Sequence, residues 1–221
     1  MPEKNTASTI QVTGSDAFEF LQGQLSNDLL RLEDAASLLT AWCNPKGRVI
    51  CLTILTRSNG AYSFSVPTEL AEDIVSRLTM FRFRAKVDFE ITASESLGDP
   101  SVAIHAGVPF IGREQSEKFT PHMLNLDLLD AISFDKGCYT GQEIVARTHY
   151  KGATRRRTLR FTSTEPLTVG DKVADGDRDI GEVLNAAGLD LLAVVPVDKA
   201  DGELTVNEIP LTRQTLPYLN T

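Results

Sequence analysis

Apolar positions in the first hundred residues follow both helical and strand spacings, which predicts a mixture of helices and strands. The first predicted element is a helix from Ser15, whose hydroxyl can cap it, with a break at Gly23. Its apolar residues recur at helical spacing, at Phe18, Leu21, Leu25 and Leu29. Strands are predicted over 37–43, 48–57, 61–66 and 87–92, with turns at 44–47 and 58–60 between the first three.

A second helix is predicted between the last two of these strands. It opens at Pro67-Thr68, and its apolar residues fit a period of 3.6 at Leu70, Ile74, Leu78 and Phe81. Three strands, a helix and a further strand in series favour an antiparallel sheet with a helix on one face. This first part of the chain is therefore predicted to be an α+β lobe.

The pattern changes after Arg157. Short strand-like segments at 158–162, 180–184 and 189–195 alternate there with turns rich in Gly, Asp and Pro. This pattern is typical of a small β-barrel or sandwich. Between the two parts, Gly98-Asp99-Pro100 marks a boundary, and the apolar segment 124–132 is predicted to be buried.

Composition narrows the class of protein. The chain has 221 residues, of which 42% are apolar and 24% charged, so it can form a core and is not wholly disordered. No apolar run reaches the roughly 18–20 residues of a membrane span, and the polar N-terminus predicts a cytoplasmic protein. The net charge of −8 disfavours general binding to nucleic acids.

The chain has three cysteines, Cys43, Cys51 and Cys138, and no Cys-x-x-Cys motif. Such a sparse, odd count favours reduced thiols over a disulfide framework. Three thiols cannot complete a four-cysteine zinc or iron–sulfur site. Metal chemistry would therefore be shared with a partner or cofactor, and Cys43 and Cys51 are expected in the core.

The segment 134–147 carries the densest candidate chemistry. Thr140 and Glu143 have the spacing of a capping box, which predicts a helix beginning near Gly141. Cys138 then precedes a helix N-terminus and lies two residues from Lys136. The helix dipole and the lysine charge both favour a thiolate and so lower the pKa of a thiol. Alternatively, Cys138 is a small buried hydrophobe and Lys136 a surface charge.

The run Lys-Gly-Cys-Tyr-Thr-Gly-Gln-Glu at 136–143 resembles the signature of the YgfZ family. These are folate-binding proteins related to the glycine-cleavage T-protein, an aminomethyltransferase, and implicated in maturing or repairing iron–sulfur enzymes. Four further segments resemble the family in the same order along the chain, at 20–28, 44–48, 82–87 and 119–127. Together these matches make the resemblance specific.

The resemblance implies a T-protein-like, three-lobed ring around a funnel for a reduced folate, with the cysteine loop near its mouth. Its lobes are an N-terminal α+β, folate-binding-like lobe at 1–97, a middle lobe at 98–154 that contains the cysteine motif, and a C-terminal β-barrel at 155–221. The chain is shorter than the family pattern, and the loss is placed between Glu90 and Ala106, so the middle lobe is expected to be trimmed.

Two positions depart from the pattern that the resemblance implies. The aspartate that T-proteins use on the folate nitrogen corresponds here to Cys51-Leu52, a neutral pair that argues against aminomethyl transfer. The expected glutamate before the Ala-Gly pair is replaced by His105, which cannot accept two N–H bonds from a pterin edge. Glu143 or Asp127 is the candidate replacement.

Cys138 and Lys136 are the candidates for chemistry. Lys46 and Arg48 are candidates for the glutamate tail of folate, because guanidinium and ammonium groups bind carboxylates. The full candidate folate set is Glu143, Gln142, Tyr139, Arg147, Arg48, Lys46, Asp127 and Trp42. The basic cluster at Arg147, Lys151 and 155–157 is either a solvated face or a site for a folate tail or an acidic partner surface. RNA ranks last among its ligands because of the overall negative charge.

Three functions are consistent with these residues. The first is a tetrahydrofolate-binding accessory protein that supports assembly or repair of iron–sulfur enzymes, with Cys138 as a transient ligand or redox thiol and no permanently bound metal. The second is a non-enzymatic scaffold with a degenerate folate pocket. The third, a folate-dependent one-carbon transferase, ranks last. The implied partners are iron–sulfur enzymes or assembly factors.

Overall fold

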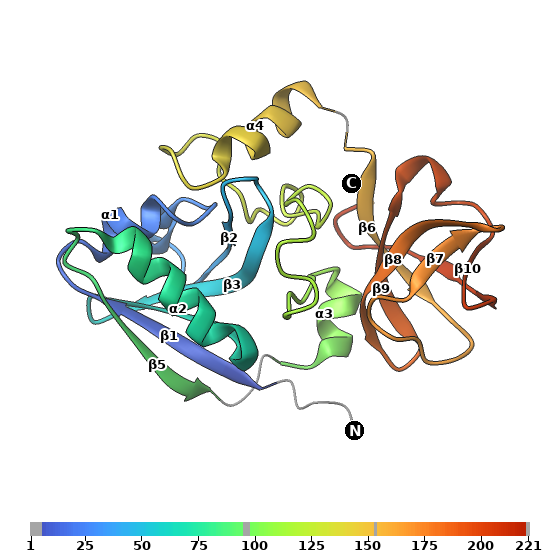
Figure 1. Cartoon of the computed structure of the whole chain (residues 1–221), viewed down its shortest axis with the longest axis horizontal. Coiled ribbons are helices and arrows are strands. Elements are labelled where there is room, and N and C mark those ends of the chain that lie inside the picture. The colour runs from blue at the N-terminus through green and yellow to red at the C-terminus, as the bar shows by residue number, and fades with distance from the viewer. Residues whose placement is uncertain (1–5, 95–97, 153, 220–221) are drawn as a thin grey trace. The chain divides into compact units, whose positions relative to one another are not determined.

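The computed structural model describes residues 6–94, 98–152 and 154–219 (Figure 1). By spatial contact the chain forms two compact units. Residues 1–97, 111–118 and 130–146 make the first unit, and residues 98–110, 119–129 and 147–221 make the second. The predicted boundary at 97 falls at residues that are not described, and the three-part division of the chain stays a prediction.

The first unit contains a five-stranded antiparallel sheet with the order β2-β3-β4-β1-β5. Its strands are β1 (Ala7–Thr13), β2 (Leu38–Cys43), β3 (Val49–Ser58), β4 (Ala61–Pro67) and β5 (Asp88–Ser94). The four predicted strands are confirmed to within a few residues. Strand β1 is not among the predicted strands; it lies inside the sheet between β4 and β5 and buries Ile10 and Val12 completely.

The helices of the first unit depart in part from the prediction. Helix α1 spans Ala17–Gln22, and Ser15 does not cap it, because its hydroxyl donates to the carboxylate of Asp16. The predicted break is confirmed, since the helix ends at Gly23. The chain continues through a short 3₁₀ helix, η1 (Leu29–Glu33).

Helix α2 (Thr68–Arg82) packs against β1, β4 and β5 (Figure 1). Three of the predicted inward residues, Leu70, Ile74 and Leu78, are buried and join the sheet in one core. The prediction was wrong for Phe81, which is 38% exposed. Burial of this apolar face holds the helix in place, because each fully buried aliphatic side chain contributes about 1.5–3 kcal/mol relative to exposure. The inward residues are Leu70, Ala71, Ile74 and Leu78.

The second unit contains a seven-stranded antiparallel sheet with the order β11-β10-β7-β8-β9-β6-β12, which forms a nearly closed β-barrel. Its core contains Phe161, Leu191 and Val195. The strands are β6 (Arg156–Thr162), β7 (Lys172–Asp175), β8 (Arg178–Ala187), β9 (Asp190–Pro196), β10 (Leu204–Val206), β11 (Ile209–Pro210) and β12 (Thr212–Gln214), with a 3₁₀ turn η2 (Val197–Lys199). This confirms the predicted C-terminal barrel.

Two further helices complete the described elements. Helix α3 (Pro100–Ala106) begins at Asp99, whose carboxylate accepts from the backbone N–H of Ser101, and packs against β8 and β9. Helix α4 spans Gln142–Lys151, and its start confirms the helix predicted near Gly141. Among the described residues, no helix is both long and apolar enough to cross a bilayer.

Candidate functional site

The cysteine motif is anchored at its start by Lys136. Its ammonium group donates to the backbone carbonyls of Gln22, Leu25 and Asn27 at 2.7, 2.7 and 2.9 Å. An ammonium has three donors, so these contacts use all of its hydrogen-bonding capacity. Burial lowers the pKa of Lys136 to about 8, opposed by the charge of Asp28. Lys136 therefore ties the cysteine motif to the loop after α1, and its predicted role in activating Cys138 stays a prediction.

The loop after α1 is fixed to the same segment by a second set of contacts. The hydroxyl of Ser26 donates to the carbonyl of Ala131 at 2.7 Å, and the backbone N–H of Ser133 donates to the carbonyl of Ser26 at 2.9 Å. The amide of Asn27 donates to the carbonyls of Leu39 and Asp130. Ser26 and Asn27 are fully buried, so these polar groups need such partners.

The end of the cysteine motif rests on the turn between β2 and β3. Gly141 has a φ of +82°, and a Cβ atom there would lie 2.5 Å from the carbonyl oxygen of Asn44. In the turn, Gly47 has a φ of +65°, and its added Cβ would lie 2.8 Å from that of Ile144. Glycine is needed at both positions because the two backbones touch.

Hydrogen bonds of the Asn44 side chain stabilise the turn. Its side-chain oxygen accepts from the backbone N–H groups of Lys46 and Arg48, and its amide donates to Glu117 at 2.8 Å. Arg77 of α2 donates to the other carboxylate oxygen of Glu117 at 2.9 Å. Both contacts hold the pKa of Glu117 below its ordinary value. A chain of polar contacts thus links α2 to the turn under Gly141.

The predicted capping box is wrong in its residues. The hydroxyl of Thr140 donates to the side-chain oxygen of Gln24 at 3.1 Å, and the backbone N–H of Thr140 donates to the carbonyl of Gly23. It is the side chain of Gln142, at 3.3 Å, that accepts from the backbone N–H of Tyr139. Through these two contacts, Thr140 joins the motif to the loop after α1.

Between these anchors lies Cys138, which is exposed and forms no disulfide. A Cβ atom added at the preceding Gly137 would have nothing within 4 Å, so the chain is open to solvent at this point. An exposed thiol on a loop that is fixed on both sides can reach a second molecule without rearrangement of the fold. This geometry suits a metal ligand, a nucleophile or a redox thiol.

The other two cysteines differ from Cys138. Cys43 and Cys51 lie buried in β2 and β3, as predicted. Burial raises the pKa of the Cys51 thiol to about 12 and that of the Cys43 thiol further. Both are therefore neutral thiols at physiological pH, and neither supplies an acid or a nucleophile.

The candidate folate residues of the first unit are divided between surface and core. Lys46 and Glu143 are exposed, whereas Tyr139 is buried beneath the Lys136 ammonium, which lies 5.3 Å from its ring centroid. Arg48 donates to the carbonyl of Lys118 at 2.6 Å. Trp42 is buried, with its indole N–H donating to the side-chain oxygen of Gln24 at 3.3 Å.

Two other candidates belong to the second unit. Asp127 accepts two hydrogen bonds from Arg157, at 2.9 and 2.8 Å, and both side chains are largely buried. Arg157 also donates to the side chain of Asn125 at 3.2 Å. Within the basic cluster, Arg157 therefore has a structural role. Arg147 is exposed on α4.

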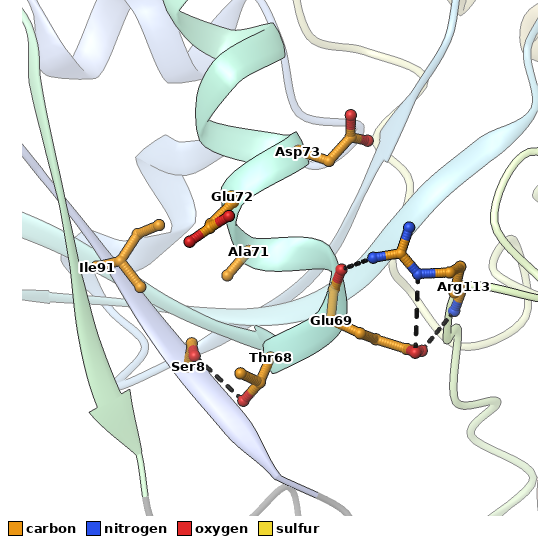
Figure 2. Close-up of a pocket in the computed structure, with 8 residues that line it drawn as sticks. All are labelled: Ser8, Thr68, Glu69, Ala71, Glu72, Asp73, Ile91 and Arg113. Atoms are coloured by element: carbon orange, nitrogen blue, oxygen red, sulfur yellow. Dashed lines mark hydrogen bonds and ion pairs between the residues drawn. The ribbon is translucent and has the colours of Figure 1, made fainter.

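A hollow of about 630 Å³ lies beside the start of α2 (Figure 2). The carboxylate of Glu69 accepts from the backbone N–H of Arg113 at 2.7 Å, and the Arg113 guanidinium bonds the carbonyl of Glu69. None of the predicted site residues lines this hollow. Its lining consists of Ser8, Thr68, Glu69, Ala71, Glu72, Asp73, Ile91 and Arg113.

Two residues that shape the site are not among those predicted from the sequence. Gln24 accepts from both Trp42 and Thr140, and Glu117 supports the turn. Gln24 lies in the 20–28 segment that resembles the family, but its partners are distant in sequence. No group of three or more His, Cys, Asp or Glu side chains suited to a metal ion occurs among the residues described.

Three kinds of comparison place the chain among known proteins. A family model described as the C-terminal β-barrel domain of CAF17 matches residues 155–218. An uncharacterized protein of Haemophilus influenzae is 31% identical over 95% of this chain and 94% of its own length. Two relatives are named tRNA-modifying protein YgfZ. The one from Klebsiella pneumoniae is 27% identical over 90% of this chain and 81% of its own length. The one from Yersinia enterocolitica is 39% identical over 52% of this chain and 39% of its own length. The chain belongs to the YgfZ family.

The fold of this YgfZ-family chain also matches a solved structure. The glycine cleavage system aminomethyltransferase T of Bartonella henselae superposes with a TM-score of 0.79, over 96% of this chain and 84% of the other, at 16% identity. This confirms the T-protein-like fold class. The alignment with the Haemophilus protein spans 264 positions, more than the 221 residues of this chain, so that relative has insertions where this chain is shorter.

Proposed function

We propose that this chain is a cytoplasmic, tetrahydrofolate-binding accessory protein that supports the assembly or repair of iron–sulfur enzymes through Cys138. One observation carries the proposal: Cys138 is the exposed cysteine, and its loop is fixed by Lys136 on one side and by Gly141 on the other. Membership of the YgfZ family and the T-protein-like fold support the folate part.

A single thiol suits a transfer or repair role better than storage. An iron–sulfur cluster needs several thiolate ligands, and the other two cysteines of this chain are buried and neutral. Cys138 would lose its proton to bind iron, and the remaining ligands would come from the client enzyme. The cluster is then cargo that passes through the site.

The residues around the turn suit a reduced folate in their chemistry. The exposed ammonium of Lys46 and the exposed carboxylate of Glu143 flank the contact between Gly47 and Ile144. A carboxylate can accept two N–H bonds from a pterin edge, and an ammonium can pair with the carboxylates of a glutamate tail. When bound, a reduced folate carries one-carbon units. The protein's part is to orient it at these two charges.

Aminomethyl transfer is the weaker alternative for this fold. In T-proteins the reaction uses an aspartate on the strand that is β3 here, and this chain has Cys51 and Leu52 there. The high pKa of Cys51 keeps it from acting as an acid–base group near pH 7. Turnover of methylene-tetrahydrofolate by the purified protein would revive this alternative.

The names of the relatives suggest a second candidate, a role in tRNA modification. We propose that such a role runs through a client enzyme, because a chain of net charge −8 repels phosphate. Fluorescence anisotropy with purified tRNA at low salt tests this. Saturable tRNA binding would favour direct action on tRNA.

Anaerobic calorimetric titration with tetrahydrofolate tests the folate part of the proposal. We expect saturable binding that weakens in Glu143→Ala and stays unchanged in Glu165→Ala, a glutamate of the second unit outside the candidate set. Absence of binding would contradict the folate part and favour the scaffold function. The role of Cys138 is tested separately, by restoring iron–sulfur enzyme activity in a strain that lacks this protein.

A further inference from the structure

The C-terminal end of α2 exposes three large apolar side chains in four residues. Met80 is 68% exposed, Phe81 38% and Phe83 89%. We call these three residues, together with Arg84, the α2 tip. Exposed single hydrophobes are common, but a cluster with two aromatic rings at the end of one helix is typical of an interaction surface.

The backbone holds Phe83 outward at a conformational cost. The backbone N–H of Ala85 donates to the carbonyl of Arg82 at 2.8 Å, closing a turn whose first central residue is Phe83. Phe83 has φ +47° and ψ −106°, close to the values of a type II′ turn, where glycine is the favoured residue. Burial does not offset this strain, because the ring faces solvent.

The α2 tip is connected to the cysteine loop through the side chains of Trp42 and Gln24. The ring of Phe81 meets Trp42 edge-on, with centroids 6.3 Å apart. The indole N–H of Trp42 donates to Gln24, and the same oxygen of Gln24 accepts from the Thr140 hydroxyl. All of these residues belong to the first unit. A molecule that covers the α2 tip therefore binds three contacts away from Thr140, in the same unit as the loop that carries Cys138.

Cationic groups lie next to the tip, in a chain whose net charge is −8. Arg84 and Lys86 are exposed, and Arg82 donates to the carbonyl of Val87 at 3.0 Å and lies 3.5 Å from Asp88. The carboxylate of Asp16 accepts from the backbone N–H of Lys86 at 2.8 Å. Three cations against two carboxylates leave a positive rim, which is complementary to an acidic partner.

We propose that the α2 tip is the docking surface for the protein that Cys138 serves, and that the partner presents an apolar socket flanked by carboxylates. The inference rests on the proposed function for the identity of that partner. Aromatic residues, Met and Arg are the types enriched at protein–protein interfaces. RNA fits less well, because phosphate affinity comes from clustered Lys and Arg, whereas three of the four residues of the tip are apolar.

Phe83→Gly separates docking from folding. Glycine relieves the positive φ, so we expect the melting temperature to rise by about 2–4 °C. The same variant should lose partner binding, because the exposed ring is gone. Ile54→Gly is the matched control, since Ile54 is another exposed hydrophobe of the first unit, at 56% exposure on β3, outside the tip. It should lose stability and keep partner binding.

Photocrosslinking in cells tests the docking directly. The full chain carries a benzophenone amino acid at position 83, or at position 54 as the control, and the covalent adduct is identified by mass spectrometry. We expect an adduct at position 83 with an iron–sulfur protein, joined at a peptide rich in carboxylates. Arg84→Glu should abolish the adduct by reversing the local charge, and position 54 should give none.

The other outcomes overturn the proposal. Equal adducts at the two positions, no adduct at position 83, an adduct removed by ribonuclease, or an adduct with a second copy of this chain would each contradict it. Cys138→Ala should leave the adduct intact, because docking precedes chemistry. If Cys138→Ala restores full iron–sulfur enzyme activity while the adduct persists, the proposed function of Cys138 is contradicted. The docking of a partner at the α2 tip is then still supported.

Discussion

Gly141 meets the backbone of Asn44 so closely that a side-chain carbon at position 141 would stand 2.5 Å from the Asn44 carbonyl oxygen. This contact seats the cysteine loop on the turn between β2 and β3. Asn44 of this turn donates a hydrogen bond to Glu117, which also accepts one from Arg77 of α2. The position of the exposed thiol therefore depends on a backbone contact that only glycine permits.

Gly141→Ala should destabilise the protein and release the cysteine loop. The added methyl group meets a backbone atom that cannot move away easily, and the φ of +82° adds strain, so a loss of about 2–4 kcal/mol is expected in urea unfolding. Gly137→Ala is the matched control, because an added Cβ there meets no atom within 4 Å. Equal stability of the two variants would show that the close contact between Gly141 and the Asn44 backbone does not stabilise the protein.

Lys136→Met should also lower the free energy of unfolding. The substitution leaves the carbonyls of Gln22, Leu25 and Asn27 without their donor, at a cost of about 2–4 kcal/mol. Limited proteolysis should then cut the loop after α1 faster than in the wild type. If Lys136 instead acts only on the thiol, the variant will unfold like the wild type and only Cys138 alkylation will slow.

The same lysine makes stability depend on pH. Burial lowers its pKa to about 8, below the unfolded value of 10.5, so between these values the unfolded state binds more protons. Stability should therefore rise with pH through this window, with a slope of at most about 1.4 kcal/mol per pH unit, and the gain should vanish as pH falls below 8. Chemical denaturation from pH 7 to 10 measures it. In Lys136→Met this contribution should be missing.

Asp127→Asn should act on stability more than on ligand binding. Its carboxylate forms a largely buried two-bond pair with Arg157, and removal of one charge leaves the other without its partner, at a cost of about 2–3 kcal/mol. Asp201→Asn is the control, since that carboxylate pairs with Arg213 in the same unit but is exposed, and about 0–1 kcal/mol is expected. If Asp127→Asn instead weakens tetrahydrofolate binding at unchanged stability, Asp127 is a folate-binding residue and the structural role is contradicted.

Local patterns in the sequence predicted much of the fold. The strands β2, β3 and β4 and the helix α2 were found because their apolar spacing and turn residues are explicit. The strand β1 was missed, although Ile10 and Val12 alternate with polar residues, because its short segment Ala-Ser-Thr-Ile-Gln-Val-Thr has few apolar residues. Its place inside the sheet comes from pairing with β4 and β5, which a local pattern does not encode.

The site was predicted less completely than the fold. The motif at 136–143 identified the exposed Cys138 and the helix after it. The partners of Lys136 lie more than a hundred residues away in sequence, so charge alone suggested a role beside the thiol. Glu117 and Gln24 gave no signal of their own, because their importance arises only where the turn, the loop after α1 and the motif meet.

The decisive measurement for the role of Cys138 is whether Cys138→Ala restores iron–sulfur enzyme activity in a strain that lacks this protein. We expect the variant to fold like the wild type, to accumulate to the same level and to restore no activity. Cys51→Ala controls for the loss of a thiol as such, and any loss of activity there should follow its loss of stability, because Cys51 is buried. Full restoration by Cys138→Ala would contradict the account.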